Sequence, residues 1–127
     1  MSGRTTRRRR QAARLGEIMA AAYLTRRGFR VVARNVHSRY GEIDLVCRGP
    51  GDGPPWVFVE VRTYRSARFG RPELSLTPQK IHRLRRLAAH YLAALGRPGD
   101  PFRLDAVTIY WPPTGEPPQV QHWPGIG

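Results

Sequence analysis

Residues 41–62, GEIDLVCRGPGDGPPWVFVEVR, combine two apolar segments with acidic side chains and constrain the fold more than any other stretch. The β-branched and aromatic residues on either side of GPGDGPP predict two strands joined by a glycine- and proline-rich turn. Because side chains alternate along a strand, Glu42 and Asp44 share one face of the first strand. Glu60 and Arg62 share one face of the second. The opposite, apolar faces are expected to carry Ile43, Leu45 and Cys47 in the first strand and Val57, Val59 and Val61 in the second.

The expected register of this hairpin brings acidic side chains together. A turn centred near Asp52 sets Asp44 opposite Glu60, and directly opposed side chains lie about 4.5–5.5 Å apart at Cβ. Two carboxylates at that distance repel each other unless a cation or a shared proton lies between them. Mg²⁺ binds carboxylate and backbone carbonyl oxygens, so Asp44, Glu60 and the carbonyl of Val61 could hold it. The alternative is a structural ion pair of Glu42 or Asp44 with an arginine on a solvent-facing sheet.

A first helix is predicted over residues 11–27, where apolar side chains recur at helical spacing, and Gly28 follows as a stop signal. Its expected apolar stripe consists of Leu15, Ile18, Met19, Ala22 and Tyr23. Glu17 opens the apolar run EIMAAAYL. It is either a charge near the helix start, which the helix dipole supports, or a third acid of the metal site.

Thr77 followed by Pro78 marks the start of a second amphipathic helix, which Gly96 ends. Its expected apolar stripe consists of Ile81, Leu84, Ala88, Tyr91, Leu92 and Leu95. Lys80, the only lysine of the chain, and Arg83 lie near the start of this helix. They are either phosphate contacts or solvated helix charges.

The remaining segments suggest the overall architecture. Residues 29–36 and 102–111 are short and rich in β-branched side chains, which predicts a strand in each, and residues 120–123 could add another. The order helix, three strands, helix, strand predicts an α/β domain with a mixed sheet flanked by helices. The expected parts of the chain are a flexible basic arm over residues 1–11, this domain over residues 12–111, and a proline- and glycine-rich tail over residues 112–127.

The charge balance points to a polyanionic partner. The chain has 22 basic and 9 acidic residues and a formal net charge of +13, so nucleic acid is the first candidate, ahead of an anionic membrane surface. A GC-rich genome would also explain the preference for arginine over lysine. The longest apolar run, IMAAAYL, is too short to span a bilayer, and the lone Cys47 agrees with a reducing compartment. We therefore expect a cytoplasmic protein without a membrane partner; a homodimer stays open.

Arginine and aromatic side chains alternate in the segment that follows Glu60. This composition is typical of a surface that follows phosphates and stacks bases, and a solvated loop is the alternative. The residues expected at this nucleic-acid-binding surface are Arg62, Tyr64, Arg65, Arg68, Phe69 and Arg71.

Four segments together resemble a known family. They are RLGEIMAAAYLTRRGFRVVARNVHSRYGEIDLV, VFVEVRTYR, LTPQKIHRLRRLAAHYL and FRLDAVTI. This combination is similar to the YraN-like family of bacterial proteins, which is placed in the PD-(D/E)xK, or restriction-endonuclease-like, nuclease superfamily. The similarity runs from about Arg14 to Ile109, which is most of the chain.

The resemblance implies a restriction-endonuclease-like core and a set of site residues. Asp44 of GEIDLV matches the metal-binding aspartate of the superfamily, Glu60 of VEVR its second acid, and Glu17 the acid of its first helix. Arg62 stands where the superfamily usually has a lysine, and Lys80 matches a lysine at the start of the family's second helix. Arginine stays protonated, so Arg62 can hold a phosphate or stabilise charge but cannot act as a base.

Two functions follow as expectations. The first is a nuclease that depends on Mg²⁺ or Mn²⁺ and hydrolyses phosphodiester bonds, with DNA favoured over RNA and branched DNA as one candidate substrate. The second is a nucleic-acid-binding module that retains the nuclease fold without the chemistry, for which Arg62 is the main argument.

Overall fold

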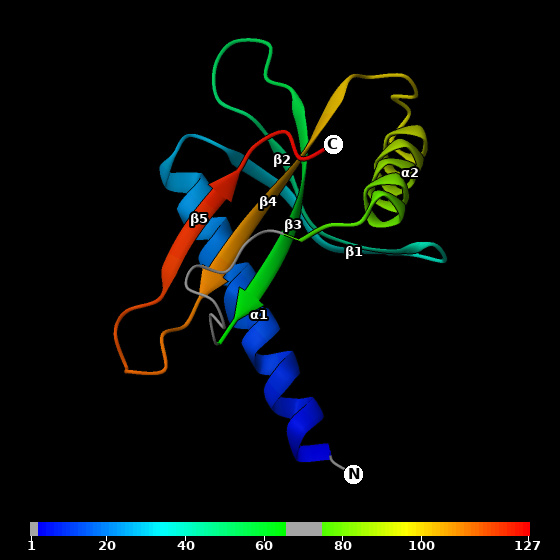
Figure 1. The fold of residues 1–127 in the computed structure, drawn as a ribbon. Helices are drawn as coiled ribbons and strands as arrows, with labels where there is room; N and C mark the ends of the chain where they lie inside the picture. The colour runs from blue at the N-terminus through cyan, green and yellow to red at the C-terminus, as the bar shows by residue number, and fades with distance from the viewer. Residues whose placement is uncertain (1–2, 66–74) are drawn as a thin grey trace.

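Five strands form one mixed sheet in the order β1-β2-β3-β4-β5. The structure is a computed structural model that describes residues 3–65 and 75–127. Its elements are α1 (Gly3–Arg26), β1 (Arg30–Ser38), β2 (Gly41–Arg48), β3 (Trp56–Tyr64), α2 (Pro78–Ala94), β4 (Phe102–Tyr110) and β5 (Gln119–Trp123). Neighbouring strands are antiparallel except β3 and β4, which run parallel and are joined through α2 (Figure 1). The predicted α/β class and element order are confirmed, and β5 adds the short strand that residues 120–123 suggested.

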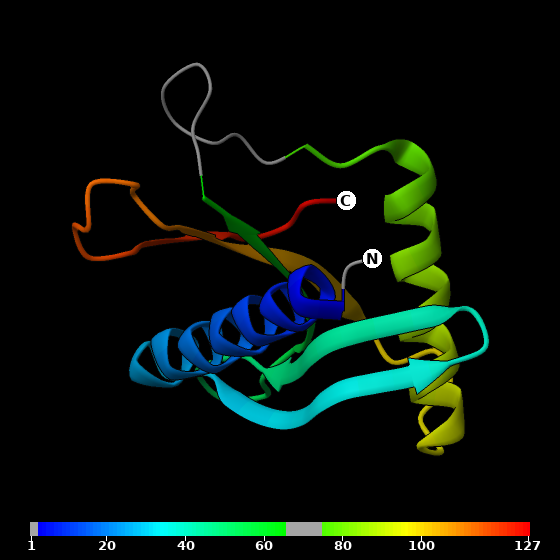
Figure 2. The same cartoon turned by 90° about the horizontal axis from the view of Figure 1, so that it is seen from below.

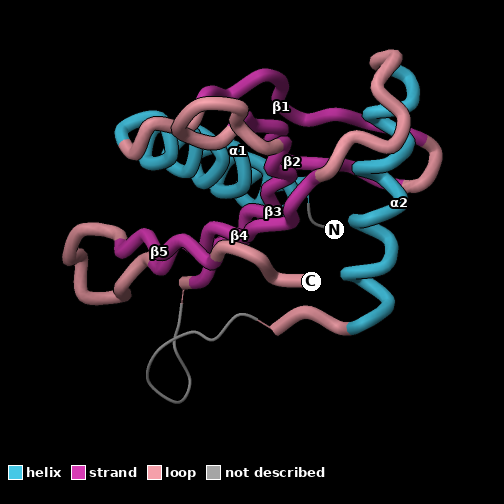
Figure 3. Tube along the Cα trace, turned by 90° about the horizontal axis from the view of Figure 1, so that it is seen from above, coloured by secondary structure: helices cyan, strands magenta, loops and turns pink. Residues whose placement is uncertain are grey.

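Two hydrophobic clusters lie on the two faces of the sheet, each beneath one helix, and Figure 3 shows the central strands between the helices. The α1 cluster is built from Ala20, Ala21, Leu24, Phe29, Leu45, Cys47, Val57, Val59, Val107 and Ile109. The α2 cluster is built from Ile43, Val46, Trp56, Phe58, Leu84, Leu87, Ala88, Leu92 and Leu104. Alternate residues of β3 enter opposite clusters, so the middle of this strand is buried on both faces.

The hairpin register is confirmed, whereas the expected division into faces needs correction. Leu45 pairs with Val59 and Arg48 with Trp56, which is the predicted register. The faces predicted to be charged are apolar in the middle of the hairpin, because α2 covers them there, and the charged residues lie at one end. Ile43 belongs to the α2 cluster rather than to the α1 cluster that contains Leu45. The ladder with β3 ends at Leu45, and beyond this point β2 pairs only with β1.

Helix α1 begins at Gly3 rather than at residue 11, so the expected flexible arm is helical from Gly3 onward. Arginine, glutamine and alanine support a helix without apolar periodicity, and for this reason the pattern did not reveal these turns. The buried face agrees only in part with the predicted stripe: Met19 and Tyr23 pack against the α1 cluster, but Leu15 and Ile18 are each 51% exposed. Small residues face the sheet instead: a Cβ at Gly16 would lie 2.6 Å from Thr63 Oγ1, so only glycine allows this close approach.

Helix α2 begins as predicted. Thr77 caps it, with its Oγ1 accepting a hydrogen bond from the Lys80 backbone N–H at 3.1 Å. The helix ends at Ala94, before Gly96, which has a positive φ of 81°. Leu87 belongs to the buried face, although it was not part of the expected stripe, and Leu95 is exposed. The β1–β2 turn reaches α2 (Figure 2), where the Tyr40 and His90 rings meet edge to face at 5.9 Å.

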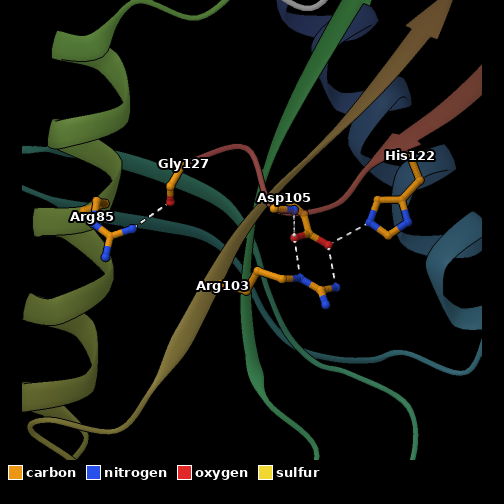
Figure 4. A network of polar contacts seen from close by, with 6 residues as sticks. Arg85, Arg103, Asp105, His122 and Gly127 are labelled. Carbon is orange, nitrogen blue, oxygen red and sulfur yellow. Dashed lines mark hydrogen bonds and ion pairs between the residues drawn. The ribbon is translucent and has the colours of Figure 1, made fainter.

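The C-terminal segment is held to the sheet by Asp105, a fully buried acid of β4 (Figure 4). Arg103 donates two hydrogen bonds to its carboxylate, at 2.7 and 2.9 Å, and the Gly125 backbone N–H donates a third at 3.0 Å. His122 Nε2 lies 2.7 Å from Asp105 Oδ2. Residues of the expected tail therefore contribute to the folded domain.

Neither helix, over the residues that the structure describes, combines the length and apolar character needed to cross a membrane.

Candidate metal centre and nucleic-acid interface

Three carboxylates from two elements meet at the charged end of the sheet. Glu17 of α1 and Glu42 and Asp44 of β2 each offer an oxygen that lies within 4.8 Å of the others. This places Glu17 beside Asp44, as expected for a third acid. Glu42, which the sequence placed only on a charged face, joins the group as well. Its position two residues before Asp44, on the same strand face, is the signal that pointed to it.

Asp44 is anchored to the neighbouring strand. Its Oδ2 accepts a hydrogen bond of 2.7 Å from the backbone N–H of Val61. Burial raises the pKa of Asp44 to about 7; the Val61 hydrogen bond opposes this rise, and the nearby charges of Glu60, Glu17 and Glu42 add to it. The site therefore favours either a proton or a cation at Asp44. The Val61 carbonyl, expected as a ligand, remains a prediction.

Glu17 has an additional contact that the sequence did not reveal. Burial raises the pKa of Glu17, a hydrogen bond from the Asn35 side chain opposes the rise, and the charge of Glu42 adds to it. Asn35 lies in β1 with a positive φ of 50°, the only non-glycine residue in the described part of the chain with this conformation. Asparagine tolerates the left-handed region better than most residues, and such positions cluster at functional sites. A sequence alone gives no sign of this contact.

Glu60 lies beside the three carboxylates, but its own partners are cations. It is 8% exposed. Its Oε2 lies 3.4 Å from Arg62 Nε and 3.3 Å from Lys80 Nζ. The sequence left open an arginine paired with Glu42 or Asp44, and the described residues show no such pair: Glu42 Oε2 lies 3.5 Å from His37 Nδ1, and Asp44 is bonded to the Val61 N–H. The ion pairs with basic side chains form at Glu60 instead.

Two adjoining clefts open around these residues. The first, here called the acidic cleft, has a volume of about 870 Å³. Its charged lining residues are Arg8, Glu17, Glu42, Asp44, Glu60, Arg65, Lys80 and Arg83. The second, here called the basic cleft, has a volume of about 670 Å³. It is lined by Tyr40, Arg62, Ser75, Thr77, Gln79, Lys80, His82, Arg83 and Arg86. Lys80 and Arg83 line both clefts.

The structure distributes the predicted nucleic-acid-binding residues unevenly. Arg65 lines the acidic cleft, and Arg62 lines the basic cleft. Tyr64 belongs to β3, and its hydroxyl group is buried without a hydrogen-bond partner among the described residues. The predicted residues Arg68, Phe69 and Arg71 lie outside the described residues.

The sequence of this α/β domain matches a known family. Residues 16–109 match the sequence profile described as "Uncharacterised protein family UPF0102". The chain belongs to this family. The matched span of this UPF0102 protein contains the acidic cluster and α2. This membership agrees with the resemblance to YraN-like proteins.

Bacterial relatives extend the likeness over most of their own length. A UPF0102 protein of Symbiobacterium thermophilum is 46% identical over 106 residues, which cover 84% of this chain and 87% of that protein. A UPF0102 protein of Renibacterium salmoninarum is 43% identical over 114 residues, or 90% of this chain and 93% of that protein. One from Syntrophomonas wolfei is 46% identical over 94 residues, or 74% and 79%.

Proposed function

We propose that this UPF0102 protein is a divalent-metal-dependent endonuclease of the PD-(D/E)xK type that hydrolyses phosphodiester bonds in nucleic acid. The observation that carries the proposal is the group of Glu17, Glu42 and Asp44, whose carboxylate oxygens lie within 4.8 Å of one another in a cleft that also contains cations. Grouped acids in a half-buried site are costly unless a cation or protons offset their charge. A function that uses a cation explains why they are together.

The donor set fits Mg²⁺ or Mn²⁺. Glu17, Glu42 and Asp44 offer only carboxylate oxygens, which are the ligands that these hard cations prefer. A bound cation would supply positive charge to the phosphate and acidify a water molecule. Asp44 is preorganised for this role, because the Val61 backbone N–H holds its Oδ2 atom in place.

Basic side chains in the acidic cleft would attract the phosphates of the substrate. Four carboxylates alone would repel a phosphate, but Arg65, Lys80 and Arg83 line the same cleft. Lys80 Nζ lies 3.3 Å from Glu60 Oε2, and both residues line this cleft. Such fixed positive groups stabilise negative charge that develops on a phosphate during its hydrolysis. In this proposal Lys80, which lines the acidic cleft, supplies such a charge, whereas Arg62 lines only the basic cleft.

A non-catalytic binding module is the second candidate. It is favoured by Glu60, the second acid of the motif, which is paired with Arg62 and Lys80 rather than grouped with Asp44. A protein of this kind would keep the positive surface and lose turnover. DNA remains favoured over RNA as the partner in both cases.

A cleavage screen separates the two candidates. Purified protein would be incubated with DNA junctions, flaps and single strands in Mg²⁺ or Mn²⁺. The nuclease should cleave at least one substrate, and Asp44→Asn should abolish cleavage. The exposed Glu116 is the matched control, because Glu116→Gln removes a carboxylate outside both clefts.

Arg62→Lys and calorimetry complete the test. Cleavage that appears only in Arg62→Lys would identify a disabled nuclease. Calorimetric titration with Mg²⁺ and Mn²⁺ should show binding to the wild type that is weakened in Asp44→Asn. If no variant cleaves any substrate or binds either cation, the nuclease proposal is contradicted and the binding module is the remaining candidate.

A further inference from the structure

The basic cleft differs in charge from the acidic cleft beside it. Arg62, Lys80, Arg83 and Arg86 line it, and no acidic side chain does so among the residues that the structure describes. The cleft lies where the end of β3 and the β1–β2 turn approach the first turns of α2. The positive end of the α2 dipole therefore adds to the charge of these side chains.

Aromatic contacts hold part of this cleft in place. The Arg86 guanidinium lies over the Tyr40 ring, with 5.0 Å between Cζ and the ring centroid. Tyr40 is itself fixed, because Arg39 donates a hydrogen bond of 2.9 Å to its hydroxyl group and His90 packs against its edge. A guanidinium restrained in this way loses little conformational entropy when it binds an anion.

The positive charge of the basic cleft is only partly compensated. Glu60 lies beside Arg62 and Lys80, so one carboxylate faces two cations. Arg83 and Arg86 form no ion pair within the described part of the chain. Planar guanidinium groups bind phosphate through paired N–H donors, so the surplus charge suits a phosphate group.

We infer that the basic cleft binds one phosphate group of a nucleic-acid strand, at a position separate from the phosphate that enters the acidic cleft. Lys80 and Arg83 line both clefts, so the clefts adjoin, and in this inference one strand runs along them and supplies both phosphates. The inference rests on the proposed function for the identity of that strand. It assigns Arg62 to phosphate binding, which explains an arginine at a position where the superfamily usually has lysine.

Metal-free binding to short single-stranded DNA tests this inference without any cleavage. Arg62→Gln/Arg86→Gln alters two side chains that line only the basic cleft. Loss of one phosphate contact should weaken binding and reduce the slope of log K against log salt by about 0.7. The control is Arg26→Gln/Arg30→Gln, which removes the same charge from exposed positions outside both clefts and should keep the slope. Arg86→Gln alone, which leaves the Glu60 pairs intact, should weaken binding in the same direction.

Three oligonucleotides of one sequence identify the source of the phosphate. They carry a 5′-phosphate, a 3′-phosphate or no terminal phosphate. An equal loss of affinity with all three would indicate an internal phosphodiester, and a loss confined to one end-phosphorylated form would indicate that terminus. Unchanged affinity and slope in both basic-cleft variants, or an equal change in the control, would overturn the inference. If the slope changes as expected but no substrate is cleaved, the endonuclease proposal is rejected and the phosphate site is supported.

Discussion

Asp44 of β2 accepts a hydrogen bond of 2.7 Å from the backbone N–H of Val61 in β3, and this bond joins the acidic cluster to the strand that carries Glu60. It forms just beyond the point where the ladder of paired residues between the two strands ends, at Leu45 and Val59. At the end of the ladder, the Asp44 carboxylate therefore accepts the hydrogen bond that a backbone carbonyl would otherwise accept. The acid is held rigidly for this reason, although it is only partly buried.

Replacement of Asp44 should change how stability depends on pH in the metal-free protein. Burial raises its pKa from 3.8 to about 7 in the folded state, so the folded protein binds this proton more tightly than the unfolded chain does. Stability is therefore expected to fall as pH rises through that window. Asp44→Asn removes the titrating group and keeps an oxygen for the Val61 N–H. Thermal unfolding in a chelator should show a higher Tm than the wild type at about pH 8, and little difference at about pH 4.

A gain in Tm of equal size at both pH values would contradict this assignment. Glu116→Gln serves as the control, because Glu116 is exposed and should leave both melting temperatures unchanged.

Replacement of Arg65 should weaken nucleic-acid binding without loss of stability. Arg65 is exposed and lines the acidic cleft, so its charge contributes to phosphate attraction and little to folding. Arg65→Ala is expected to reduce the salt slope for single-stranded DNA by about 0.7, with an unchanged Tm. Fluorescence anisotropy at several salt concentrations measures the slope. A lowered Tm with unchanged affinity would instead place Arg65 among the structural residues.

Replacement of Asp105 should destabilise the domain at neutral pH. Burial raises the pKa of Asp105, but hydrogen bonds from Arg103, Gly125 and His122 outweigh burial and lower it overall. Because the folded-state pKa lies below the unfolded value of 3.8, its contribution to stability is present above that pH and is lost as pH falls below it. Asp105→Asn is expected to cost about 1–2 kcal/mol, because it weakens the hydrogen bonds that the buried carboxylate accepts, while the half-exposed Arg103 is solvated by water.

Urea denaturation at neutral and acidic pH measures this effect. The wild type and Asp105→Asn should approach each other in stability as pH falls below 3.8. An equal difference at both pH values would show that packing, rather than charge, determines the cost.

Replacement of Gly16 tests the close approach of α1 to the sheet. A Cβ at this position would lie 2.6 Å from Thr63 Oγ1, so Gly16→Ala should be destabilising by about 1–2 kcal/mol despite the better helix propensity of alanine. In a Thr63→Ala background the clash is removed, and Gly16→Ala should then stabilise by about 1 kcal/mol. A double-mutant cycle by thermal denaturation measures the coupling, and additive effects would contradict the contact.

The sequence predicted most elements because each has a local signal. Thr77 and Pro78 predicted the start of α2, and the glycine- and proline-rich turn predicted the hairpin register. The first turns of α1 were not predicted, and its buried face was predicted only in part: Met19 and Tyr23 pack against the α1 cluster. Leu15 and Ile18 were expected on the buried face because their side chains are apolar, but both are exposed. Near Gly16 the helix lies so close to the sheet that only a small residue fits. No local sequence pattern indicates how close a helix lies to a sheet.

The sequence by itself determined that acids stand in apolar surroundings at positions 17, 44 and 60, because unpaired charges are conspicuous in such segments. Only the tertiary structure decided how they are partnered: Glu42 and Glu17 gather at Asp44, and Glu60 turns to Arg62 and Lys80. These groupings join residues of α1, β2, β3 and α2 that are far apart in sequence. They depend on how the strands end and where the helices cross the sheet, and this long-range packing leaves no periodic trace in the chain.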